Sequence, residues 1–171
     1  LIFTIFSVAV LVPFQCVMLP LLAEMGKLNM INMPGLMLVN LGFGSSMSII
    51  LFHGFMKNVP VELEEAASID GASQPRIFFT IVLPLIKGIA VTVAILNVMS
   101  LWNDYLLPSL TINRSGTQTL PLRTYLFFGA YTKKWNLGSA ALVMAIIPVI
   151  IFYVLCQKHI IKGVTEGAVK G

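Results

Sequence analysis

The chain has 171 residues, of which 57% are hydrophobic and only 11% are charged. Soluble domains carry roughly 25% charged residues, so this composition excludes a soluble globule as well as a disordered or collagen-like chain. The net charge of +4 comes from Lys and Arg residues scattered over loops and the ends of apolar runs, which favours contact with anionic membrane lipid over binding of nucleic acid.

Four long uncharged runs predict helices that cross a membrane. They cover residues 1–22, 33–56, 88–107 and 135–157, and each reaches the ~20 residues that a helix needs to cross a hydrocarbon core of about 30 Å. The sequence therefore predicts an all-α, polytopic transmembrane helical bundle, formed as one domain by residues 1–171. Because Leu1 already lies inside an apolar run, we expect this chain to be the C-terminal part of a longer protein.

The first two spans differ in character. Pro13 and Pro20 are expected to kink the first span without preventing it from crossing the membrane, and Glu24 and Lys27 mark a short polar loop after it. Residues 32–35 predict the turn into the second span. That span is rich in Gly and Ser, which indicates packing against protein rather than lipid.

Residues 57–87 predict a helix–turn–helix at the membrane surface. Pro60 and the glutamates that follow it suit the first turn of a helix, and Asp70-Gly71 ends that helix because Gly adopts a positive φ without strain. Ser73 is expected to cap a second helix, with Pro75 in its first turn. The segment holds four of the seven acidic residues of the chain, and from the residues alone a solvated amphipathic loop is the simpler interpretation.

The third span carries Asn97, then Asn103 and Asp104 near its far end, and is expected to close at Pro108. An intramembrane acid faces a cavity or a partner in most cases, but a helix end that reaches the headgroups explains Asp104 equally well. The loop 109–134 has four basic residues and no acid. The fourth span is expected to end at residue 157, before a tail too short and too rich in Gly for a domain.

The residues predict neither a catalytic site nor a metal site. His53 and His159 have no second ligand at a metal-binding spacing, and the chain has no nucleophile elbow and no Gly-rich phosphate loop. Cys16 and Cys156 both lie in apolar spans and indicate no disulfide framework. The chain is therefore not expected to be an enzyme. Lys and Arg are almost equally divided between the two sides of the predicted topology, so charge leaves the orientation open.

A long motif follows the acidic cluster. Glu65-Ala66-Ala67 is followed after three residues by Gly71, and then after nine more by Ile81, Leu83 and Pro84. This pattern resembles the EAA signature of the permease subunits of binding-protein-dependent ABC importers. Residues 12–15, 18–21, 102–108, 119–122 and 163–171 resemble segments of the carbohydrate permeases of that family, of the maltose-permease G type. The resemblance extends over essentially the whole chain.

The resemblance implies a type I importer permease fold, with four of six expected spans present. It implies that the acidic helix is the coupling helix, which lies in the cytoplasm and docks in a groove on an ATPase subunit. The residues implied in this role are Glu64, Glu65, Ala66, Ala67, Asp70, Gly71 and Ala72. Loop 109–134 would then lie outside, where an extracytoplasmic sugar-binding protein docks.

The resemblance also implies partners and a location. They are a second permease subunit and two ATPase subunits in a bacterial or archaeal cell membrane, with ATP and Mg²⁺ on the ATPase subunits and no cofactor in this chain. Asn97, Asn103 and Asp104 are the candidates for the translocation path, although in this family the main sugar contacts can lie on the other permease subunit. Two alternatives remain: a permease for a solute other than a sugar, and a membrane scaffold that transports nothing.

Overall fold

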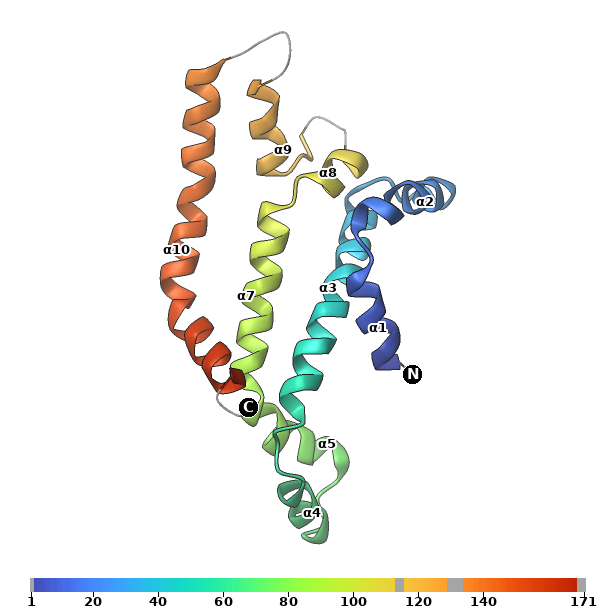
Figure 1. Cartoon of the computed structure of the whole chain (residues 1–171), viewed down its shortest axis with the longest axis vertical. Helices are drawn as coiled ribbons and strands as arrows, with labels where there is room; N and C mark the ends of the chain where they lie inside the picture. The colour runs from blue at the N-terminus through green and yellow to red at the C-terminus, as the bar shows by residue number, and fades with distance from the viewer. Residues whose placement is uncertain (1, 113–115, 129–133, 169–171) are drawn as a thin grey trace.

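A computed structural model describes residues 2–112, 116–128 and 134–168, which form helices and no strand. The helices are α1 (Ile2–Leu11), α2 (Phe14–Lys27), α3 (Met33–Met56), α4 (Val61–Ile69), α5 (Gln74–Ile77), the π-helical η1 (Phe78–Val82), α6 (Leu83–Leu85), α7 (Lys87–Asn103), α8 (Leu106–Thr111), α9 (Leu120–Tyr125), the 3₁₀ turn η2 (Leu126–Phe128) and α10 (Trp135–Ala168). Helices α3, α7 and α10 follow the long axis of the molecule, with α4 and α5 at one end and α2, α8 and α9 at the other (Figure 1).

Two helices are long and apolar enough to cross a membrane singly, α3 and the part of α10 up to Gln157. Two bent helix pairs qualify if each is counted as one span, which brings the number of candidate spans among the described residues to four. Helix α3 has the bounds expected for the second span. Helix α10 begins at Trp135 as expected but continues through the tail to Ala168, so the tail prolongs a helix.

Local signals explain where α3 begins. The Asn32 side chain accepts a hydrogen bond from the backbone N–H of Gly35 at 2.9 Å, and Pro34 lies in the first turn. A Cβ atom on Gly35 would come within 1.8 Å of the carbonyl oxygen of Met30, so only Gly fits this close approach. The turn predicted at residues 32–35 lies earlier in the chain, at 28–32, because Asn32 is already the N-cap of α3 and residues 33–35 form its first helical turn.

The first predicted span, 1–22, differs from expectation, because Ile2–Leu11 and Phe14–Lys27 are two helices that meet at 107°. Pro13 takes an extended conformation between them, with ψ 138°, and α1 alone, with ten residues, is about 15 Å long. Helix α2 then continues through the expected polar loop, where Lys27 Nζ and Glu24 Oε1 pair at 2.7 Å on an exposed surface. Such an exposed pair adds less than about 1 kcal/mol.

The third predicted span also differs. Its approach, Gln74–Leu85, meets α7 at 71°, and α7 ends at Asn103 because Asp104 is extended, with ψ 124°. Pro108, expected to close the span, lies in the first turn of the separate helix α8. The following loop contains two further short helices, α9 and η2. The start of α10 lies against η2 so closely that a Cβ on Gly138 would be 2.5 Å from the ring of Phe128.

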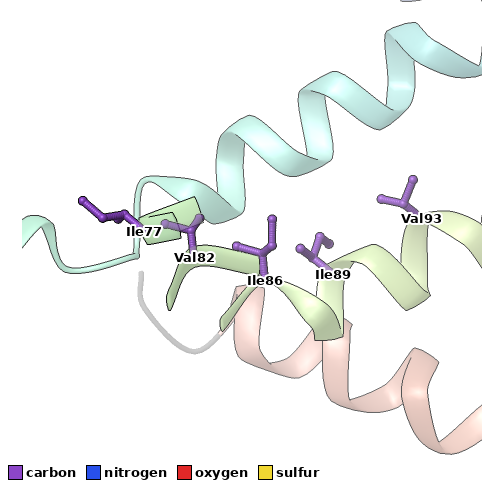
Figure 2. Close-up of a cluster of buried hydrophobic side chains, with 5 residues drawn as sticks. All are labelled: Ile77, Val82, Ile86, Ile89 and Val93. Carbon is purple, nitrogen blue, oxygen red and sulfur yellow. The ribbon is translucent and has the colours of Figure 1, made fainter. Parts of the chain in front are cut away.

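Two small buried clusters lie at opposite ends of the molecule. One consists of Ile77, Val82, Ile86, Ile89 and Val93; Figure 2 shows Ile86, Ile89 and Val93 pointing from the α6–α7 segment toward α3. The other, at the α8–α9 end, consists of Leu36, Leu107, Ile112 and Leu122. Between them, the most apolar window of α10 has no residue buried within the described chain, as expected for helices that face lipid or other protein.

Candidate functional site

Helix α4 ends in a hydrogen-bonded reversal that explains the spacing of its motif. The N–H of Ala72 donates to the carbonyl of Ala67 at 3.0 Å, and the N–H of Gly71 donates to that of Ser68 at 3.1 Å. This pair of bonds is a Schellman motif, which requires a left-handed residue just after the helix. Gly71 provides it with φ +81°, which confirms the positive φ predicted for this residue.

The motif residues divide between two faces of α4. Ala67 and Ala72 are half-buried and pack against the cluster at Ile77–Val93. The opposite face is exposed and carries Glu62, Glu65, Ala66 and Ile69, at the i, i+3, i+4, i+7 spacing of one helix stripe. Ile69 is 86% exposed. Of the other predicted coupling residues, Asp70 and Gly71 are exposed and Glu64 is half-buried.

The same cluster joins α4 to the two long helices. Leu51, Phe52 and Phe55 of α3 pack against the cluster, and Ile89 and Val93 of α7 belong to it. Helix α4 itself packs against α5 and η1, so the cluster connects it to α3 and α7 indirectly. The segment 57–87 forms a surface helix–turn–helix, but Ser73 makes no side-chain capping bond.

The three residues predicted for a translocation path occupy different surroundings. Asn97 is half-buried between α7 and α3, where its Nδ2 group donates to Ser48 Oγ at 3.0 Å. Asn103 is exposed at the end of α7, and its Nδ2 donates to the carbonyl of Met99 at 2.8 Å. Asp104 is half-buried after α7, with its carboxylate near the backbone N–H groups of Leu106 and Leu107 at the start of α8. Asn103 and Asp104 are adjacent in the chain, whereas Asn97 lies apart from them.

An aromatic cavity of about 310 Å³ lies between α7, α9 and α10. Asn103 lines it, together with Trp102 and Tyr125, and the Trp102 indole N–H donates across to the carbonyl of Ala145 at 3.3 Å. The rings of Tyr105 and Tyr125 lie 4.8 Å apart, centroid to centroid, at its edge. Asn103 is thus the predicted path residue that faces a cavity.

Sequence reasoning missed two features of these sites. The outward position of Ile69 follows from helical spacing with Glu62 and Glu65 and could have been found in that way. The contribution of Tyr125 and Phe128 to the aromatic cavity could not, because it depends on how α9 and η2 pack against α10. Among the described residues, no three His, Cys, Asp or Glu side chains lie where they could share a metal ion.

A model of the family described as "binding-protein-dependent transport system inner membrane component" matches residues 1–166. The chain is 51% identical over 170 residues to a protein described as the probable starch degradation products transport system permease protein AmyC of Thermoanaerobacterium thermosulfurigenes, covering 99% of this chain and 62% of that protein. It is 36% identical to MsmG of Streptococcus mutans, a multiple sugar-binding transport system permease protein, covering 98% of this chain and 61% of the relative.

It is also 34% identical to MelC of Bacillus subtilis, described as a melibiose/raffinose/stachyose import permease protein, with coverage of 99% and 62%. The chain thus spans about three-fifths of the length of these relatives.

Proposed function

Since the chain belongs to the family of inner membrane components of binding-protein-dependent transport systems, we propose that it serves as a membrane-spanning permease subunit of an ATP-driven sugar importer. The observation that supports the role best is the placement of α4, a surface helix with an exposed acidic and apolar stripe, fixed by a buried cluster to two long helices. Relatives described as permeases for starch degradation products and for melibiose, raffinose and stachyose favour an oligosaccharide as the solute.

In this proposal α4 is the coupling helix. The exposed stripe of Glu62, Glu65, Ala66 and Ile69 meets a groove on an ATPase subunit, with Ile69 supplying an apolar anchor and the carboxylates complementing positive charge. Movement of that ATPase subunit displaces α4. Because α4 packs on α5 and η1, whose residues belong to the cluster shared with α3 and α7, the displacement reaches the long helices through that cluster.

Other subunits of the importer hydrolyse ATP. Two ATPase subunits bind ATP and Mg²⁺, a second permease subunit covers apolar faces of the long helices, and an extracytoplasmic sugar-binding protein delivers the solute. The loop after α7 lies at the end of the molecule opposite α4 (Figure 1), where that delivery would occur. Lipid covers the remaining apolar surface.

The aromatic cavity is the place where this chain would contact the solute. Sugar rings present apolar C–H faces edged by hydroxyl groups, so a cavity with aromatic walls and a side-chain amide suits them. Trp102 and Tyr125 supply the walls and Asn103 supplies the amide. Asp104 orders the start of α8 beside this cavity through its backbone contacts.

The test is reconstitution of the permease subunit with its partners in vesicles, with labelled raffinose and starch oligosaccharides as probes. We expect ATP-dependent uptake that requires the binding protein. Glu65→Lys should reduce co-purification of the ATPase subunit, because it reverses a charge on the docking stripe. Glu24→Lys is the matched control, since Glu24 is equally a surface glutamate but lies in α2 at the opposite end of the molecule. Equal retention of the ATPase subunit by both variants would contradict the assignment of α4.

A further inference from the structure

Asn97 makes a polar contact between two long helices. Its Nδ2 group donates to Ser48 Oγ on α3 at 3.0 Å and to the carbonyl of Val93 on its own helix at 3.0 Å. The Ser48 hydroxyl in turn donates to the carbonyl of Gly44 at 2.7 Å. The three residues therefore form one chain of hydrogen bonds that connects α7 to the backbone of α3.

Gly44 provides the space for this contact. A Cβ atom built on Gly44 would come within 2.8 Å of Asn97 Oδ1. The amide has little freedom to retreat, because its Nδ2 is bonded on both sides. In contrast, a Cβ on Gly42 or Gly54 of the same helix would meet nothing within 4 Å. The close approach of α3 to α7 is thus made at the glycine that faces Asn97, and not at Gly42 or Gly54.

The contact between Asn97 and Ser48 lies next to the buried apolar cluster at Ile77–Val93. Asn97 follows Val93, the last member of the buried cluster, by one helical turn, and Ser48 precedes Leu51 and Phe52 by one turn on α3. Residues at this spacing lie on the same side of a helix. The interface between α3 and α7 therefore has apolar contacts at the end near α4 and a polar contact deeper in the span.

We propose that Asn97 is a positioning residue that, through Ser48 and Gly44, fixes the register of α3 against α7, so that the two helices and α4 move as one body. In lipid there is no hydrophobic drive between apolar helices, so close packing and hydrogen bonds determine how they associate. The effect of this contact on transport rests on the proposed function. The inference assigns to Asn97 a role in the contact between two helices, away from the solute.

The expected consequence is a change in coupling with no change in solute recognition. In reconstituted vesicles, Asn97→Leu and Gly44→Ala should lower the amount of sugar imported per ATP hydrolysed by about three- to tenfold, which corresponds to loss of one interhelical hydrogen bond in a membrane. The KM for sugar should stay unchanged. Gly42→Ala and Gly54→Ala are the matched controls and should keep the wild-type ratio, because an added methyl group meets nothing there.

A reversible cross-link gives the decisive experiment. In a chain with Cys16→Ser and Cys156→Ser, the pair Ser48→Cys and Asn97→Cys should form a disulfide on oxidation in membranes, since the two native side chains touch. Reduced, this double variant should show the lowered coupling ratio. Oxidised, it should recover import close to the level of its Cys-free parent, because a covalent bond replaces the lost contact between helices that do not slide.

The outcomes separate the inference from the proposed function. If oxidation stops import and reduction restores it, α3 and α7 move against each other and the inference is overturned. An altered KM at an intact coupling ratio would place Asn97 in the solute path and overturn the inference. If the disulfide forms but the wild-type assembly imports no sugar, the geometry stands and the proposed function fails.

Discussion

Gly71 shows how one residue determines the direction of the chain at the end of α4. Its φ of +81° lies in the left-handed region, where a residue with a Cβ costs about 1–2 kcal/mol. A Cβ there would meet no other atom of the described chain within 4 Å. Strain in the backbone, rather than a clash inside this subunit, is therefore what a substitution introduces.

We predict that Gly71→Leu abolishes stimulation of ATP hydrolysis by loaded binding protein, while the chain still inserts in the membrane. The turn is strained, and a bulky side chain stands beside the exposed stripe of α4. Gly71→Asn is the matched control, because Asn tolerates the left-handed region better than other residues with a Cβ, and it should keep most of the stimulation. Hydrolysis in vesicles, with and without loaded binding protein, measures both; normal stimulation in Gly71→Leu would refute the role of this turn.

Asp104 acts on the backbone that follows α7. Because its carboxylate lies near the N–H groups of Leu106 and Leu107, where it can act as a cap, Asp104→Ala should lower the stability of the assembled protein by about 1 kcal/mol, the usual cost of losing a cap, and should reduce sugar uptake. Asp104→Asn keeps an acceptor oxygen and should retain both. Thermal unfolding and uptake are the measurements. If Asp104→Asn loses as much uptake as Asp104→Ala, the charge matters rather than the cap.

At the scale of the helix, the packing of α4 should be weakened by a substitution at one motif alanine and not at its neighbour. Ala67 packs on the buried cluster, whereas Ala66 faces outward. Ala67→Glu places a charge against apolar side chains, so we expect the amides of α4 to exchange hydrogen at least about tenfold faster. Ala66→Glu should leave the exchange unchanged. Hydrogen–deuterium exchange of the α4 peptide compares the two, and equal protection would mean that α4 is not held through Ala67.

The sequence allowed prediction of those boundaries that have local causes. Asn32 and Pro34 start α3, and Gly71 ends the turn after α4, because a cap or a positive φ is a property of one or two residues. The end of α7 at Asn103 was not predicted. Asp104-Tyr105 interrupts an apolar run without Gly or Pro, whereas Pro108, the stronger signal, suits the first turn of a new helix.

The candidate site was predictable only in part for the same reason. The motif from Glu65 to Ala72 was located through its resemblance to the EAA signature, whereas its reversal at Gly71 follows from the residues alone. That Asn97 contacts Ser48, or that Tyr125 approaches Trp102, depends on contacts between residues far apart in the chain. Periodicity within one helix carries no information about which neighbour it meets.

At the scale of the whole molecule, apolar surface dominates. Most large apolar side chains of α10 are exposed in the described part of the chain. An exposed apolar surface that runs along a whole helix marks contact with lipid or protein. We predict that the subunit made alone elutes from size-exclusion chromatography in detergent as a polydisperse species. Co-expression with a second permease subunit should give a single peak. A monodisperse monomer with a cooperative thermal transition would contradict this view.

The reversal at the end of α4 fixes the length of this segment as well as its direction. The bonds from Ala72 to Ala67 and from Gly71 to Ser68 close rings of fixed residue count, so the interval between the inward alanine and the glycine is a length and cannot drift by one. The residues between them, Ser68, Ile69 and Asp70, are all exposed, so the backbone alone sets this interval. A single inserted residue, however small, would turn the exposed stripe of α4 by about 100° relative to the membrane helices. The length of this segment is therefore constrained separately from the docking role proposed for Ile69.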